Sequence, residues 1–205
     1  MHTITQGNYN ILTESVFLLK KGDKTAFESI ALQCFALQYQ NNPVYRQFTD
    51  ALRLNPEVIK TSSQIPFLPI EIFKTQKVVT ETNISNNLTV FTSSGTTDTG
   101  TSHHYVNDIA LYEKSFLKSF ELFYGNPEGY CVLALLPSYL ERSSSSLVYM
   151  AQKLIELSKS KESGFYLNNL DELEKTISLV KEKKWKTILL GVSYALLDLI
   201  ERGIT

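Results

Sequence analysis

The sequence is poor in cysteine, in long apolar runs and in net charge of either sign. Its 2 cysteines are too few for a disulfide scaffold in a chain of 205 residues. No uninterrupted apolar run approaches the ~18 residues that cross a bilayer, so we expect a cytoplasmic protein without a membrane span. The formal net charge of −1 gives no reason to expect a nucleic acid or an anionic membrane surface as a partner.

Several familiar catalytic and metal-binding patterns are also missing. No cluster of histidine, cysteine and aspartate has zinc spacing, and the adjacent His103 and His104 would point to opposite faces of a strand. We therefore assign no metal site, although one of these histidines is a candidate for contact with a ligand. The serine run 143–146 lacks the Gly-x-Ser-x-Gly turn of serine hydrolases, so we interpret it as a helix cap. A buried thiol has a raised pKa, which favours a core role for Cys131 over a nucleophilic one.

A hydrophobic content of 43% is enough to bury a core in one domain or slightly more. The first third of the chain has helical spacing: residues 25–28 fit a capping box, and apolar residues follow on one helical face until the Asn-Pro pair at 42–43. A second short helix is expected at 44–52. We therefore predict a helical N-terminal segment over residues 1–60.

Strands and helices are predicted to alternate in the second half of the chain. Asn107 or Asp108 can cap a helix that ends near Gly125, and apolar strands are expected at 130–136, 164–167 and 186–192, each followed by a helix. This alternation is typical of β-α-β units with a largely parallel sheet. The predicted fold class is α/β, with residues 61–205 forming an α/β nucleotide-binding subdomain after the helical segment.

The most distinctive stretch covers residues 88–101. An apolar strand, 88–91, is followed by a run of hydroxyl side chains that contains Gly95 and Gly100. Backbone amides and hydroxyls in such a loop can hold an anion. No Gly-Lys-Ser/Thr follows, so this is not the common phosphate loop, and a plain polar surface loop is the alternative interpretation. Ligands of parallel sheets bind beyond the carboxyl ends of strands, so we expect the loops after Thr92, Leu136 and Val192 to share one rim.

Residues 91–97, Phe-Thr-Ser-Ser-Gly-Thr-Thr, resemble the phosphate-binding signature of the adenylate-forming, or acyl-activating, ligases. Within that superfamily the chain is most similar to the LuxE-type acyl-protein synthetases and related acyl transferases. Segments 65–74, 136–150 and 190–194 also resemble blocks of that family. The resemblance covers most of this chain but only the N-terminal part of such an enzyme, so we expect a chain truncated at its C-terminus. It implies that the α/β region is part of the N-terminal domain of an adenylate-forming ligase.

The resemblance implies a reaction and a set of site residues. A carboxylic acid, here a fatty acid, attacks the α-phosphate of ATP, and the resulting acyl group passes from the adenylate to a protein cysteine or another thiol. ATP and Mg²⁺ are the implied cofactors, and the implied partners are a small-molecule carboxylic acid and an acyl-acceptor or acyl-donor protein. The residues implied to contact the phosphates are Thr92, Ser93, Ser94, Gly95, Thr96 and Thr97. Those implied to lie at the acyl or adenylate pocket are Gly191, Val192 and Ser193, and no catalytic residue is assigned.

The sequence also departs from the family pattern. Asp98 stands where the family usually has glycine, and no Pro-Lys-Gly follows, so a carboxylate lies close to the expected triphosphate and needs Mg²⁺ or another cation to offset it. The downstream adenine-binding and ribose-binding motifs are not in this sequence, nor is the late acyl-accepting cysteine. Two alternatives stay open: a non-catalytic partner protein that keeps the fold and docks onto an acyltransferase or reductase, and an acyltransferase that uses a preformed thioester without ATP.

Overall fold

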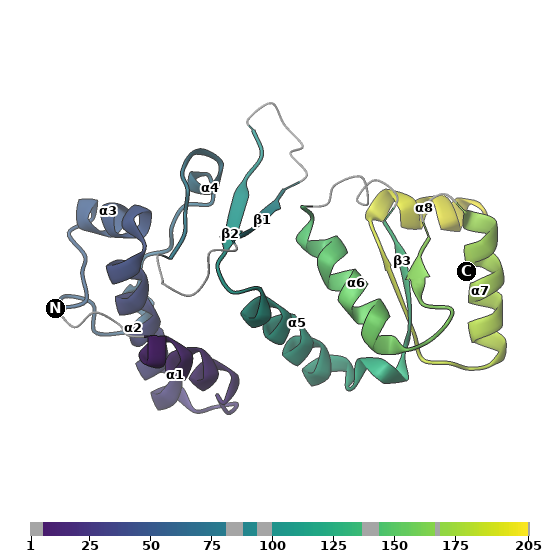
Figure 1. The fold of residues 1–205 in the computed structure, drawn as a ribbon, viewed down its shortest axis with the longest axis horizontal. Coiled ribbons are helices and arrows are strands. Elements are labelled where there is room, and N and C mark those ends of the chain that lie inside the picture. Colours follow the sequence, from purple (N-terminus) through teal and green to yellow (C-terminus); the bar gives the residue numbers. More distant parts are fainter. Residues whose placement is uncertain (1–5, 81–87, 94–99, 137–143, 167–168, 205) are drawn as a thin grey trace. The chain divides into compact units, whose positions relative to one another are not determined.

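The computed structural model describes residues 6–80, 88–93, 100–136, 144–166 and 169–204 of the chain (Figure 1). The protein is a mixture of helices and small sheets, which confirms the α/β class. Its internal contacts divide the chain into two compact units, residues 1–115 and 116–205. The predicted nucleotide-binding role of residues 61–205 stays a prediction. In the described ranges, no helix combines the length and the apolar character that a membrane crossing requires.

The first unit begins with three helices, α1 (Gln6–Phe17), α2 (Lys24–Asn41) and α3 (Pro43–Ala51). The predicted capping box at the start of α2 is wrong, because Asp23 is the N-cap and its Oδ1 accepts a hydrogen bond from the Ala26 amide at 2.9 Å. Glu28, the expected acidic member of the box, instead accepts from the amide of Ser62 at 2.5 Å and from its hydroxyl at 2.7 Å. This carboxylate therefore joins α2 to the short helix η1 (Ser62–Gln64).

The core of the first unit forms between α2, α3 and the proline-containing segment that follows them. Phe35 and Tyr45 meet edge to face at 6.1 Å, and Ile65 and Leu68 pack against the same cluster. The Tyr45 hydroxyl donates to the carbonyl of Pro66 at 2.7 Å. The segment therefore packs on this core and then enters the short helix α4 (Ile72–Thr75).

Two strands form an antiparallel hairpin in the first unit, β1 (Thr89–Thr92) and β2 (His103–Val106). The sequence predicted the first of them as an apolar strand at 88–91. After β2, the Asp108 side chain caps α5 (Ile109–Tyr124) by accepting from the Leu111 amide at 3.0 Å. The helix ends at Gly125, whose φ of +86° suits glycine. Both predicted ends of this helix are confirmed.

The second unit is built on a three-stranded parallel sheet in the order β4-β3-β5. The strands are β3 (Cys131–Leu135), β4 (Gly164–Phe165) and β5 (Thr187–Gly191), and the helices are η2 (Pro127–Gly129), α6 (Ser146–Ser158), α7 (Leu170–Glu182) and α8 (Ser193–Glu201). Every residue of β3 is buried. Ser145 caps α6 by accepting from the Val148 amide, which confirms the capping role of the serine run.

Alternate side chains of β3 serve two different cores. Leu133 packs with Leu173 of α7 and Leu199 of α8, while Val132 packs with Leu154 of α6 on the opposite face. Successive side chains of a strand point to opposite faces, so a strand that is apolar at every position needs a cover on both. Figure 1 shows α6 on one side of β3 and α7 on the other. The second unit is thus a three-layer α/β/α structure.

A pair of substitutions tests whether Asp23 or Thr25 caps α2. Asp23→Ala removes the side-chain acceptor, so we expect the free energy of unfolding to fall by about 1 kcal/mol. Thr25→Ala removes the expected cap of the sequence pattern and should leave the stability nearly unchanged. Urea unfolding followed by circular dichroism measures both variants. An equal loss for Asp23→Ala and Thr25→Ala would contradict the assignment.

Candidate functional site

The hydroxyl-rich stretch connects the two strands of the β1-β2 hairpin. The Ser93 amide donates to the carbonyl of Ser102 at 3.1 Å, and the Ser102 amide donates to the Ser93 hydroxyl oxygen at 3.1 Å. Thr92 and His103 face each other as the last strand pair before the connection. Gly100 has a φ of +86°, a conformation that favours glycine. The base of the connection is therefore a closed, hydrogen-bonded ring.

Two of the residues implied to bind phosphate, Thr92 and Ser93, lie at this ring. The other four, Ser94, Gly95, Thr96 and Thr97, lie outside the described residues, as does Asp98. The Ser93–Ser102 hydrogen bonds close the base of the connection. They do not show that a ligand binds there, so the phosphate-binding role of all six residues stays a prediction.

One face of the hairpin is anchored by aromatic contacts within the first unit. Phe91 is only 6% exposed and its ring lies 5.2 Å from that of Tyr112 on α5. His104, the strand partner of Phe91, stacks on Phe73 of α4. The two ring centres are 4.7 Å apart and the ring planes form an angle of 21°. The histidine that shares a face with Phe91 therefore has a packing role.

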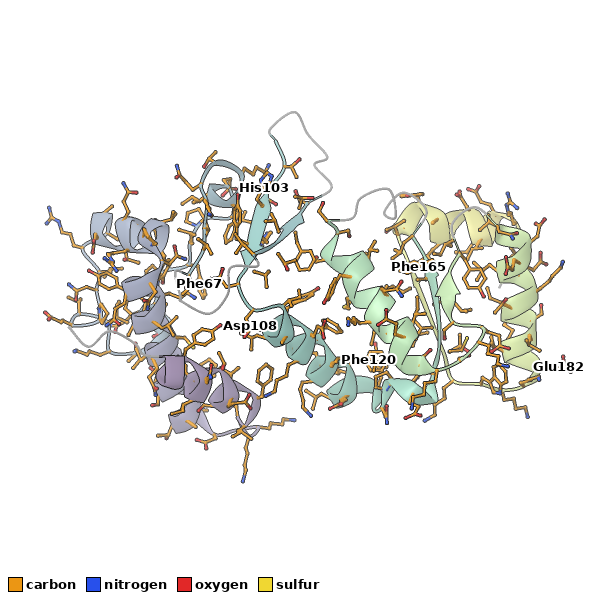
Figure 2. The ribbon with its side chains drawn as sticks, in the orientation of Figure 1. Phe67, His103, Asp108, Phe120, Phe165 and Glu182 are labelled. Atoms are coloured by element: carbon orange, nitrogen blue, oxygen red, sulfur yellow. The ribbon has the colours of Figure 1, made fainter. Side chains whose placement is uncertain are left out.

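The other face of the hairpin is polar and aromatic. The His103 and Tyr105 rings lie 6.3 Å apart and nearly parallel, as expected for alternate residues of one strand. The ammonium nitrogen of Lys77 lies 5.6 Å from the centre of the Tyr105 ring. Figure 2 labels His103 on β2, close to α4. His103 is one of the two histidines that the sequence indicated as candidates for contact with a ligand. The sequence did not indicate Lys77, because its approach to Tyr105 joins residues that are distant in the chain.

The residues implied to form the acyl pocket lie in the second unit, where β5 meets α8. Gly191 ends β5, Val192 is the N-cap of α8, and Ser193 is the first residue of that helix. A Cβ on Gly191 would lie 2.6 Å from Cδ2 of Leu196, so any larger residue here would force the Leu196 side chain to shift. Val192 packs against the cores on both faces of the sheet. Two of the three residues therefore have a structural role, whether or not a ligand binds.

The single rim expected at the carboxyl ends of parallel strands is not supported by the sheet pairing. β1 pairs antiparallel with β2 and is not part of the three-stranded parallel sheet. Within the parallel sheet, Leu135 and Gly191 are register partners at the carboxyl ends of β3 and β5. The loop that begins after Leu136 covers residues 137–143, outside the described ranges. Of the three loops that were expected to share a rim, the two after β3 and β5 follow strands that end at the same edge of the parallel sheet.

Two cavities in the second unit were not expected from the sequence. One, of about 430 Å³, opens at the amino end of β3 near Tyr130, Lys159 and Trp185. Cys131 lines this cavity. Burial raises the pKa of the Cys131 thiol, although hydrogen bonds with Ser160 and Ser163 act in the opposite direction and lower it. The other, of about 640 Å³, is an apolar groove between β5, α7 and α8. The raised thiol pKa supports the interpretation of Cys131 as a core residue.

The described residues contain no group of three or more histidine, cysteine or acidic side chains that could hold a metal ion. Comparisons with protein-family models, with curated proteins and with solved structures found no match to this chain. The likeness to acyl-protein synthetases therefore stays a prediction from the sequence.

Gly191 allows a direct test of its packing role. We expect Gly191→Ala to lower the free energy of unfolding by about 1–3 kcal/mol, because the added methyl group overlaps the Leu196 side chain. Gly164 lies in β4 of the same sheet, and a Cβ there meets nothing within 4 Å, so Gly164→Ala is the matched control. Thermal unfolding of both variants checks the difference. Equal stability of the two would show that close packing does not require Gly191.

Proposed function

We propose that this chain belongs to an ATP-dependent acyl-activating enzyme of the acyl-protein synthetase type. The enzyme joins a fatty or other carboxylic acid to AMP as an acyl-adenylate and then transfers the acyl group to a protein cysteine or another thiol. The single observation that carries the proposal is the closed base of the hairpin, formed by Ser93 and Ser102 beneath a connection rich in hydroxyls and glycine.

The chemistry of this base suits the proposed role. The hydroxyl oxygen of Ser93 accepts a hydrogen bond from the Ser102 amide. The hydroxyl hydrogen of Ser93 is not used in this bond and can be donated to another acceptor. Pyrophosphate departs readily only when donors spread its charge, and fixed hydroxyls and amides do so with little reorganisation. The closed base would hold the first donors of the loop in a defined place. We propose that Thr92, Ser93, Ser94, Gly95, Thr96 and Thr97 contact the phosphates.

ATP and Mg²⁺ are the proposed cofactors. Mg²⁺ in such sites is held mainly by substrate phosphates, water and one or two carboxylates, so it needs no cage built by the protein alone. Asp98 is the acidic residue of the loop in the sequence and is a proposed neighbour of the ion. The ion would polarise a phosphoryl oxygen and offset the charge of the leaving pyrophosphate.

Gly191, Val192 and Ser193 are the proposed wall of the acid or adenylate site. Support comes from their place at the carboxyl end of β5, the end of a parallel sheet at which α/β proteins bind ligands. The exposed start of α8 also offers backbone N–H groups, which can donate hydrogen bonds to a carboxylate or phosphate oxygen. The acyl acceptor is proposed to be a protein thiol.

Binding of ATP·Mg²⁺ tests the proposal. Isothermal titration should detect ATP·Mg²⁺ binding to the unmodified chain, and Gly95→Ala should weaken it about tenfold because the loop loses a residue that lets backbone approach the phosphates. Gly129→Ala is the matched control, since a Cβ there meets nothing within 4 Å. Absence of ATP binding, or equal binding by both variants, would refute the proposal. Release of pyrophosphate on addition of fatty or aryl acids then separates it from an acyltransferase that uses a preformed thioester.

A second candidate function is favoured by the outer surface of α8. Tyr194, Leu197 and Ile200 are 49%, 57% and 63% exposed and follow one another at a spacing of three residues. Such a stripe on one helical face is typical of a helix that packs against another protein. The observation fits the alternative of a non-catalytic partner that docks onto an acyltransferase or reductase.

If the chain is a non-catalytic partner, a change on α8 should weaken binding to the partner protein, whereas a change in the hydroxyl-rich loop should not. Leu197→Glu should weaken binding to an acyltransferase or reductase about tenfold or more, because it places a charge in an apolar contact. Gly95→Ala should leave the same affinity unchanged. Surface plasmon resonance with the purified pair measures both. A complex that depends on Gly95 but not on Leu197 would exclude this alternative.

A further inference from the structure

Lys77 lies next to β2, the strand that returns from the hydroxyl-rich loop. Its ammonium nitrogen is 5.6 Å from the centre of the Tyr105 ring, and the Tyr105 ring lies 6.3 Å from that of His103. His103 in turn is the strand partner of Thr92, the first residue of the loop. A cation, an imidazole and a hydroxyl therefore follow one another along a single face, ending at the closed base of the loop.

The backbone around Lys77 is anchored although its side chain is exposed. Val78 is 8% exposed, and the Gln76 amide donates to the carbonyl of Ile72 at the end of α4 at 2.8 Å. Three residues after Lys77, the carbonyl of Thr80 accepts a hydrogen bond from the side-chain amide of Asn107. The Thr80 hydroxyl donates to the side-chain oxygen of Gln38 on α2 at 3.0 Å. The backbone is thus held on both sides of Lys77, by α4 before it and by Asn107 and Gln38 after it.

The loop itself has a deficit of positive charge. Residues 92–102 contain no lysine or arginine, and their one charged side chain is the carboxylate of Asp98. A triphosphate bound there would meet donors but no protein cation from the loop. Lysine is well suited to fill this role, because its compact ammonium carries three donors on a flexible stem.

We propose that Lys77 and His103 form an anion site together with Thr92 and Ser93, and that Lys77 supplies the cation that the loop lacks. The ligand class is a polyphosphate chain, either that of a nucleoside triphosphate or an inorganic one. The inference rests on the proposed function in that it assigns further residues to the same phosphate site. The Tyr105 ring holds the ammonium of Lys77 beside β2 in the absence of ligand, and the exposed lysine would move along the strand toward a phosphate.

The proposed movement is short. His103 and Tyr105 are two residues apart on one strand, which corresponds to about 7 Å. The ammonium of Lys77 would move by about this distance to pass from the Tyr105 ring to a group beside His103. The same face presents the imidazole and the Thr92 side chain, which would contact the same chain of phosphates.

The test is titration of the full chain with inorganic tripolyphosphate and, separately, with ATP·Mg²⁺ and with adenosine. Lys77→Met should weaken binding of tripolyphosphate and of ATP·Mg²⁺ about tenfold, and Lys77→Arg should retain most of the affinity. His103→Gln should weaken both by a smaller factor. Lys60→Met is the matched control, because it removes the charge of another exposed lysine in the first unit. Because Lys77 and Lys60 are exposed, neither change should alter the melting temperature.

The outcomes separate this inference from the proposed function. Equal binding by Lys77→Met and Lys60→Met overturns the assignment of Lys77, even if ATP·Mg²⁺ binds and pyrophosphate is released. Tripolyphosphate binding that depends on Lys77, without pyrophosphate release for any acid, supports the anion site and rejects acyl activation. Adenosine binding that matches ATP binding overturns the anion site, because the phosphates would then contribute nothing. Stronger binding at 50 mM than at 300 mM salt is expected for a charge-dependent site.

Discussion

Burial of both faces of β3 is the constraint on which the second unit depends. Its residues are apolar without interruption, so the strand is stable only when helices cover the two sides of the sheet. α6 meets this need on one face, and α7 and α8 meet it on the other. Parallel pairing with β5 then brings Gly191 level with Leu135 at one sheet edge. The place of the proposed acid site is a consequence of how a fully apolar strand is covered.

The hairpin of the first unit obeys a different requirement. Its two faces are unlike: Phe91 and His104 contact aromatic rings of α5 and α4, whereas Thr92 and His103 form a half-buried pair on the opposite face. A strand period of two assigns these residues to opposite faces, so Thr92 and His103 lie together on the face that Phe91 does not share. The base is closed by the pair Ser93 and Ser102. Anchoring on one face thereby orients the potential donors on the other.

The sequence predicted best those elements whose signal is local. Asp108 and Gly125 mark the ends of α5, Ser145 caps α6, and the run of apolar residues after Tyr130 is the buried strand. It failed where two acceptable local patterns compete. The box from Thr25 to Glu28 fits the rule, yet Asp23 lies two residues earlier and caps the helix, and Glu28 binds Ser62, a contact distant in sequence. The approach of Lys77 to Tyr105 is also non-local, so no pattern in the sequence could have indicated it. Strand pairing has the same limit, since an apolar segment such as Leu88 to Phe91 does not tell whether its partner is parallel or antiparallel.

The order of strands in the parallel sheet has a consequence for the behaviour of the protein in concentrated solution. β4 is short and ends the sheet on one side, but β5 has five residues and no strand pairs with its outer edge in the described part of the chain. Leu189 on that edge is 40% exposed beside the apolar groove. An uncovered edge of this kind is a template for another extended backbone. The colloidal behaviour of the protein, as distinct from the stability of its fold, therefore depends on what covers one strand.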